Sequence, residues 1–592
     1  MHVAGIVFHL IGKIIRSVFH LGLFIMERPL LAAIVAGLLV LLFLRWALFP
    51  QRSLPGNRVR HQLISTHLRL HPGRGHATIF ELWQHWGKWS VLRKSKRTRP
   101  DLSYWQRLRH PREHSVFIGR GHWRHALRIL AELHVLVMSP PRMGKTLWLC
   151  KMILRYPGPV INTSVKEDVF RLTSGIRAKR GRIHVFNPQG IGGVPSTFQL
   201  NPVAGCEVKS VAIRRAQALC NAADTASMKD GDWFKSKAAQ ILAELLYVAA
   251  LLRGDLQVVA SWVFKGTERA EEQLLRLGEE TGAAVVYELH NSPAEKTRAT
   301  FQMVLSQVLG FLGDPALAVS VLPREGLGFD IASFIESRDT LYLITDSDQD
   351  TSPLAPLFAM FLSEFKAIGT MIGQRNTTGR LRRPNGWFLD EITQCAPIAL
   401  DKILAACGGL GIQVFTVVHG EAQLRKRWGD NGAQIIWDAS NVKLLLPGIT
   451  DDKTLEKMSR ICGKVSYQQK DQEHKYQYDV MEPAMIRALP DRMGVAVRNN
   501  RAPMIVHLPR VIRDLGYLRA KWRGQDVAKV LGVIEQQAVR DQVTAQVLEQ
   551  LEDAPAVPVV HGGNGHNPSA YPWAERLWPS PRKAGTPQTS LS

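Results

Sequence analysis

Residues 133–146 read LHVLVMSPPRMGKT, and this stretch decides the fold. The apolar run LHVLVM has the composition of a buried strand, and LWLCKMILR, which follows the stretch, has that of a helix. A strand that leads through a tight turn ending in Gly-Lys-Thr into a helix is typical of a phosphate-binding loop. The sequence therefore predicts an α/β fold with such a loop between the strand and the helix.

The residues of this loop have separate predicted roles. Gly144 permits close approach of the backbone to phosphate, Lys145 reaches the β- and γ-phosphates, and the Thr146 hydroxyl is a Mg²⁺ ligand. Ser139 stands where the common pattern has glycine, but it is small, and the two following prolines stiffen the turn. The predicted nucleotide-binding residues are Ser139, Pro140, Pro141, Arg142, Met143, Gly144, Lys145 and Thr146, and the predicted cofactors are ATP and Mg²⁺.

A second half of the site is predicted in GWFLDE, residues 386–391. Here an apolar strand ends in two acids, so that Asp390 can hold Mg²⁺ and Glu391 can take a proton from the attacking water. Paired acids after a strand also occur as an ordinary helix cap. The combination with the phosphate-binding loop favours catalysis, with Asp390 and Thr146 as metal ligands and Lys145 and Glu391 as catalytic residues.

The run IQVFTVVHG ends at His419, a position from which motors of this architecture contact the γ-phosphate, usually with glutamine. His419 is therefore a third catalytic candidate, whose charge would vary with pH. A structural histidine is the alternative. Gln423 and Arg425 are further candidates, with a solvated surface position as the alternative for the arginine.

Further apolar runs resemble the strands of a doubly wound, largely parallel sheet. Most are separated by segments of helical length, and the interval between the third and fourth runs is long and reads as helix. Its segment WFKSKAAQILAELLYVAALLRG, residues 233–254, is apolar on more than one face, as in a helix buried in a bundle. Besides LHVLVM, the predicted strands are PVINTS, RIHVFNP, TLYLITD, GWFLDE, IQVFTVVHG and VKLLLPG.

The chain of 592 residues is too long for one ordinary core, and its formal net charge of +24 is unevenly placed. Residues 51–124 contain 16 Lys or Arg against three acids, which is +13 of the total. This basic segment also carries five tryptophans. They are either aromatic platforms among phosphate contacts or apolar anchors, with Arg93, Lys94, Lys96, Arg97 and Arg99 lying against anionic lipid.

Residues 29–49 contain one charge, Arg45, and predict a transmembrane helix. A cleaved signal peptide is the alternative, but the run is too long and lacks a small-residue cleavage site. Residues 3–25 predict a second span or an interfacial helix, because Lys13 and Arg16 lie mid-segment. By the positive-inside rule, the basic block after residue 50 places the rest of the chain in the cytoplasm.

Other site classes are excluded. The six cysteines form no C-x-x-C pair and are expected as buried thiols, and the 20 histidines give no metal-ligand spacing. DSDQD at residues 346–350 imitates a calcium loop, but Thr351 replaces the required glycine and Leu357 the required glutamate.

Five segments together resemble the type IV secretion coupling proteins of the TraG type, across most of residues 130–510. The loop SPPRMGKT is similar to that family's phosphate-binding loop, and WFLDEITQCAPIALDKILAACGGLGIQVFTVVHGEAQLRKRWG to its whole Walker B region. VINTSVKEDV, with Lys166 and Asp168, looks like its second strand, and FQLNPV like its W-N-P-L segment. In DASNVKLLLPGITDDKTLEKMSRICGK an asparagine precedes a strand and Asp-x-x-Thr follows it. His419 in place of glutamine and Met143 in place of serine depart from the family pattern.

The resemblance implies a membrane-anchored ATPase with a RecA-like motor interrupted by an all-α domain. It implies a homohexamer that passes relaxase-linked, single-stranded DNA from relaxosome proteins to a type IV secretion channel, with an arginine from a neighbouring subunit completing each site. A septal-type dsDNA translocase, a non-hydrolysing membrane receptor and secretion of protein alone remain as alternatives. The predicted divisions are a membrane anchor (1–50), a basic juxtamembrane segment (51–129), two motor parts (130–204 and 331–515), the all-α domain (205–330), a C-terminal helical segment (516–553) and a disordered tail (554–592).

Overall fold

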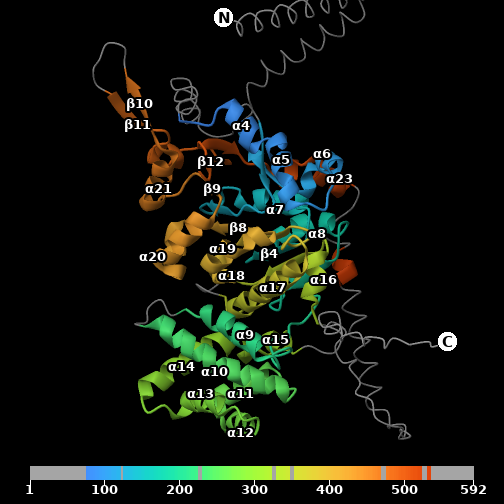
Figure 1. The fold of residues 1–592 in the computed structure, drawn as a ribbon, viewed down its shortest axis with the longest axis vertical. Helices are drawn as coiled ribbons and strands as arrows, with labels where there is room; N and C mark the ends of the chain where they lie inside the picture. Colours follow the sequence, from blue (N-terminus) through green and yellow to red (C-terminus); the bar gives the residue numbers. More distant parts are fainter. Residues whose placement is uncertain are drawn as a thin grey trace, which may run out of the picture. The chain divides into compact units, whose positions relative to one another are not determined.

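The computed structural model describes residues 75–121, 125–224, 230–322, 328–346, 352–468, 475–522 and 530–534 (Figure 1). The two predicted membrane segments, the first part of the basic segment and the predicted tail lie outside these residues. So do most of the calcium-like loop and most of the predicted C-terminal helical segment.

The core is an eleven-stranded sheet in the order β2-β1-β13-β12-β9-β3-β8-β7-β4-β6-β5. The seven strands from β9 to β5 run parallel, and all seven were predicted from apolar runs. Their residues are almost entirely buried, as in parallel sheets with helices on both faces. The α/β prediction with a mostly parallel sheet is confirmed. These strands are β3 (Val135–Met138), β4 (Val160–Ser164), β5 (Ile183–Phe186), β6 (Thr340–Ile344), β7 (Asn385–Asp390), β8 (Ile412–Val418) and β9 (Val442–Leu445).

The other four strands extend the sheet in antiparallel fashion beyond β9. Two of them come from the segment that the sequence placed outside the motor, so the sheet begins before residue 130. Both strands include basic residues and positions that are only partly buried, so a search for continuous apolar runs does not find them. These strands are β1 (Ser115–Arg120), β2 (Ala126–Leu130), β12 (Met493–Arg498) and β13 (Met504–His507). A separate hairpin pairs β10 (Lys464–Gln468) with β11 (Lys475–Asp479).

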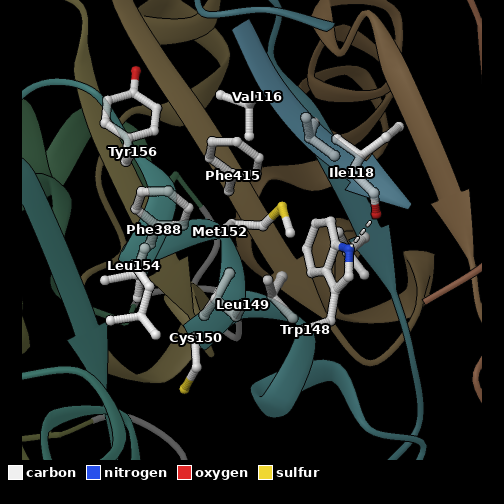
Figure 2. Close-up of a cluster of buried hydrophobic side chains, with 14 of the residues drawn as sticks. Val116, Ile118, Trp148, Leu149, Cys150, Met152, Leu154, Tyr156, Phe388 and Phe415 are labelled. Atoms are coloured by element: carbon white, nitrogen blue, oxygen red, sulfur yellow. Dashed lines mark hydrogen bonds between the residues drawn. The ribbon is translucent and has the colours of Figure 1, made fainter. Parts of the chain in front are cut away.

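Helix α7 (Lys145–Arg155), which follows the loop, is the centre of one core face (Figure 2). Its Trp148 is 1% exposed and donates a hydrogen bond from Nε1 to the backbone oxygen of Ile118 in β1, over 2.7 Å. Phe388 and Phe415, from neighbouring strands, stack at 4.4 Å between ring centroids beneath it. Packing of this kind fixes α7, and with it the loop, against the sheet.

Between β5 and β6 the described residues form helices and no strand. Helices α9 to α15 lie inside the interval 205–330 and gather into a bundle (Figure 1), in which α10 buries mostly Ala, Leu and Val. Arg214 and Arg215 of α9 both pair with Glu364 of α17, at 2.8 and 3.3 Å, and join the bundle to the motor. The helices of the bundle are α9 (Lys209–Asn221), α10 (Gly231–Leu251), α11 (Leu256–Lys265), α12 (Glu268–Arg276), α13 (Glu280–Asn291), α14 (Glu295–Leu309) and α15 (Pro315–Val319). Helices α16 (Ile331–Glu336) and α17 (Ala355–Arg375) follow the bundle, on either side of β6.

Among the described residues, α17 is the one helix that is long and apolar enough to cross a membrane, and most of it is buried inside the fold. All six cysteines are buried, as predicted. The remaining helices are α4 (Ile79–Trp86), α5 (Lys88–Thr98), α6 (Tyr104–Arg109), α8 (Asp168–Arg177), α18 (Ile392–Cys395), α19 (Leu400–Leu410), α20 (Glu421–Ala439), α21 (Asp452–Cys462), α22 (Pro483–Arg487) and α23 (Leu515–Trp522).

Candidate nucleotide site

The predicted loop, residues 139–146, joins the carboxyl end of β3 to the N-terminus of α7. The backbone N–H of Ser139 donates to the oxygen of Val418 at 3.0 Å, which holds the start of the loop against β8. Gly144 is the N-cap of α7 with φ 86°, a left-handed conformation that glycine adopts without strain. Among the described residues no side chain caps this helix end, so its first N–H groups have no such partner. This arrangement suits an anion.

The two departures from the common loop pattern have structural explanations. Ser139 also donates from its hydroxyl to the oxygen of Pro140, at 3.0 Å, which tightens the turn. A Cβ added at Gly448, after β9, would lie 3.3 Å from Pro140 and 3.4 Å from the Met143 side chain. Pro140 and Met143 therefore lie against the backbone at Gly448, where a larger residue would be crowded and φ is 85°.

Lys145 lies between the two predicted acids. Its Nζ donates to Glu391 Oε1 at 3.2 Å and is 3.9 Å from Asp390 Oδ1. The structure thus brings together three residues that the sequence places in distant segments, at the shared carboxyl ends of β3 and β7. Pockets for ligands form at this edge in open α/β sheets.

Asp390 ends β7 in a buried position. Burial raises the pKa of its carboxyl to about 6, an effect that Lys145 opposes and Glu391 reinforces. Oδ1 is buried and has no hydrogen-bond partner, although Lys145 is near. The backbone oxygen of Asp390 accepts from Thr163 Oγ1 at 3.2 Å, so β4 fixes the strand end. An orphaned carboxylate oxygen with a fixed backbone fits a hard cation or its water ligand.

Glu391, by contrast, is partly exposed and has left-handed backbone angles, φ 50° and ψ 44°. Such angles cost a non-glycine residue about 1–2 kcal/mol. Strain of this kind accumulates at functional sites, and here it turns the glutamate side chain toward the loop.

His419 lies between the loop and Glu391. Its Nδ1 is 3.2 Å from the backbone oxygen of Ser139, an acceptor only, so Nδ1 carries the proton. Nε2 is 4.0 Å from Glu391 Oε1. The backbone N–H of His419 donates to Gln423 Oε1 at 2.8 Å. His419 thus lies against both the loop and Glu391, and Gln423 supports its backbone.

Arg425 is held within its own chain. It lies 3.7 Å from Glu421 and 3.9 Å from Asp451. Asp451 also accepts from Thr454 Oγ1 at 2.5 Å, and this hydroxyl accepts in turn from the backbone N–H of Glu421. The Asp-x-x-Thr pattern therefore fixes the start of α20, just after His419.

Asparagines in two other segments of the family resemblance hold the backbone in place. Asn441 Oδ1 accepts from the backbone N–H of His134 at 3.0 Å and sets β9 against β3. Asn201 Oδ1 accepts from the N–H groups of Val203 and Ala204, which closes a turn before α9. Lys166 is exposed in the loop before α8.

Sequence reasoning missed Arg492, which precedes β12. It has φ 63°, and its Cγ lies 3.4 Å from the position that a Cβ would take on Gly144. Its buried Nε has no hydrogen-bond partner, and burial together with Arg510 and Arg513 lowers its pKa. Arg492 is distant from the loop in sequence, and no motif indicates it.

Comparison with known proteins gives one consistent group of relatives. Residues 384–491, from the start of β7 through α22, match a family described as the TraM recognition site of TraD and TraG. Protein VirD4 of Rhizobium rhizogenes is 22% identical over 420 residues, 64% of this chain and 59% of the relative. Protein VirD4 of Rhizobium radiobacter is 23% identical over 63% of this chain and 56% of its own length. The chain thus spans less than two thirds of the length of these relatives.

Two solved structures have a similar fold. The unbound bacterial conjugative coupling protein TrwBdeltaN70 matches with a TM-score of 0.52 and 18% identity, over 72% of this chain and 92% of that chain. The plasmid coupling protein TrwB in complex with a non-hydrolysable ATP analogue matches with a TM-score of 0.50 and 20% identity, over 65% and 88%. These comparisons confirm the fold class and the resemblance to the coupling proteins.

Proposed function

We propose that this relative of the type IV secretion coupling proteins is a membrane-anchored ATPase of the bacterial inner membrane, with the bulk of the chain in the cytoplasm. It recruits conjugative DNA with its bound relaxase and translocates it to a type IV secretion channel. The observation that carries this proposal is the meeting of Lys145, Asp390 and Glu391 beneath an uncapped helix N-terminus.

The residues fit ATP and Mg²⁺. The loop N–H groups and Lys145 would hold the β- and γ-phosphates, while Thr146 and Asp390 would hold Mg²⁺, which neutralises phosphate charge when bound. The orphaned Oδ1 of Asp390 supports this assignment. One TrwB structure is described as a complex with ADP and Mg²⁺, which supports the same ligands here.

Glu391 would take the proton of the attacking water. Its contact with Lys145 holds the carboxylate near the loop, and bound phosphate would compete for the lysine. His419 would report the γ-phosphate to α20 through the backbone that Gln423 holds. The positions of Lys145, Glu391 and His419 thus suit charge stabilisation, proton abstraction and sensing.

The proposed assembly is a homohexamer that binds relaxosome proteins and single-stranded DNA. The matched family description names recognition of TraM by TraD and TraG, which supports a relaxosome partner for residues 384–491. The formal net charge of +24 supports a polyanionic substrate.

The test is steady-state ATP hydrolysis by the full-length chain, with and without single- and double-stranded DNA. Lys145→Ala and Glu391→Gln are each expected to lower the rate by at least about 100-fold. Lys402→Ala is the matched control, because Lys402 is an exposed lysine on α19.

A DNA-stimulated rate that both site variants abolish and the control retains would support the motor. A preference for single strands would separate conjugative transfer from a septal-type pump. ATP binding without turnover, with either DNA, would instead identify a non-hydrolysing receptor.

A further inference from the structure

Helices α4, α5 and α6 carry a surface that the nucleotide site does not explain. Five large aromatic side chains are exposed there: Phe80 by 64%, Trp83 by 51%, Trp89 by 52%, Tyr104 by 52% and Trp105 by 65%. Seven exposed cations accompany them: Lys88, Arg93, Lys94, Lys96, Arg97, Arg109 and Arg112. These twelve residues are called the aromatic-basic face below.

The five exposed aromatic side chains are not part of the buried core. The opposite sides of α4 and α5 provide the packing, since Leu82, Trp86, Val91 and Leu92 are 5% exposed or less. Phe80 lies beside Trp83, and Tyr104 beside Trp105. Exposed aromatic pairs of this kind mark an interaction site, because each ring leaves a large apolar area in water.

Three cations of the face share one side of α5 with an aromatic residue. Trp89, Arg93, Lys96 and Arg97 are spaced by three or four residues and are all exposed, so the aromatic and basic groups share a helix side. Burial, followed by Arg498 and other neighbouring arginines, lowers the pKa of Lys94. This is the direction expected in a region of positive potential.

Acidic residues do little to neutralise the face. Glu81 completes a capping box with Thr78, and Asp101 pairs with Arg99 at 2.7 Å. Arg99 is itself buried, as is Arg107, so the suggestion that Arg99 lies against lipid is wrong. Its guanidinium instead fixes the turn between α5 and α6.

We propose that the aromatic-basic face docks on an anionic lipid surface. Amphipathic aromatic rings and cations are the groups that settle at the boundary between headgroups and acyl chains. The predicted transmembrane helix ends at residue 49, and α4 begins at Ile79, so the tether spans at most about 100 Å. Such a tether keeps the face at high effective concentration near the bilayer, an advantage that nucleic acid lacks. This inference rests on the predicted anchor and is independent of ATP hydrolysis.

The test places single cysteines on the face of the full-length chain in lipid nanodiscs. Trp83→Cys and Trp105→Cys are labelled with an environment-sensitive fluorophore, and doxyl-labelled lipid serves as the quencher. The native cysteines are all buried, so the label reacts at the introduced site. Tyr287→Cys on α13 is the control, because Tyr287 is 53% exposed but lies outside the face.

In phosphatidylcholine discs containing phosphatidylglycerol, lipid is expected to quench the labels at 83 and 105 but not at 287. Combining Arg93→Glu, Lys96→Glu and Arg97→Glu should weaken association of the face with lipid by about fivefold or more for each cation removed, and the quenching at 83 and 105 should be lost with it. A circular-dichroism melt of the triple variant checks that the fold is retained.

Three results would overturn the proposal. Labels at 83 and 105 that behave like the label at 287 would show that the face does not meet lipid. Shielding by single-stranded DNA without lipid quenching would identify a nucleic-acid surface. Shielding that rises with protein concentration in neutral discs would identify a contact between subunits.

Discussion

Asp390→Asn is expected to stabilise the ligand-free fold while it removes hydrolysis. Burial raises the pKa of Asp390 from its ordinary value of 3.8 to about 6, so the native chain holds this proton more tightly than the unfolded chain. At about 1.4 kcal/mol per pH unit, the difference corresponds to about 3 kcal/mol of cost for the ionised carboxylate above pH 6. Asparagine carries no charge, but its buried amide still needs hydrogen-bond partners. The free energy of unfolding should therefore increase by about 1–3 kcal/mol at pH 8.

The sign of the pH dependence follows from the same comparison. Stability of the wild-type chain is expected to fall as pH rises from about 4 to about 6, because the native state binds more protons in that window. In the Asp390→Asn variant this fall in stability between about pH 4 and pH 6 should be absent. Its Lys145 keeps the closer of its two acidic partners, Glu391 at 3.2 Å.

Thermal unfolding without nucleotide, measured across this pH range, is the assay. A gain of 1–3 kcal/mol corresponds to an increase of about 1–5 °C in Tm for a folded unit of this size. Asp430→Asn, at an exposed position of α20, is the control and should change Tm by little. With ATP and Mg²⁺ the order should reverse, since only the wild-type chain has the metal ligand. An unchanged slope between pH 4 and 6, or a lower Tm for Asp390→Asn at pH 8, would refute the reasoning.

Three further predictions concern the residues around the loop. His419→Gln keeps a donor toward the backbone oxygen of Ser139, so ATP hydrolysis should persist. Loss of all ATPase activity would contradict this. Arg492→Gly should relieve about 1 kcal/mol of left-handed backbone strain and so raise Tm. The same change should weaken ATP binding about fivefold, as measured by calorimetry. An unchanged affinity for ATP would mean that Arg492 acts only in packing. Trp148→Ala should lower the free energy of unfolding by about 3–5 kcal/mol, measured by thermal or denaturant unfolding. Trp148→Phe should lower it by only about 1–2 kcal/mol, because phenylalanine retains most of the packing and loses the hydrogen bond to Ile118. Equal losses would show that packing does not contribute more than the hydrogen bond.

The sequence reveals those parts of the fold that depend on local composition. Each parallel strand is a continuous apolar run because both of its faces are covered, so β3 to β9 can be recognised one at a time. The strands β1 and β2 are half-buried and lie among basic residues, and their place in the sheet depends on pairing with β13 and with each other. Pairing partners of that kind cannot be read from one segment. The same limit applies to Arg492, whose position beside Gly144 results from β12 joining β9 across the sheet.

The sequence predicts the pair Asp390 and Glu391 but not the different surroundings of the two carboxylates. Two adjacent carboxylates predict one metal ligand and one proton acceptor. Their residue types alone do not say which carboxylate is buried and which is exposed. The difference arises because β7 ends between them. Asp390 is still in the strand and buried, with its backbone held by Thr163, whereas Glu391 has left-handed angles and reaches solvent. One carboxylate thus acquires a raised pKa and an orphaned oxygen suited to a cation, and the other a lysine contact and room for water. Exchange of the two residues would preserve the composition of the pair and place each side chain in the environment that suits the other role.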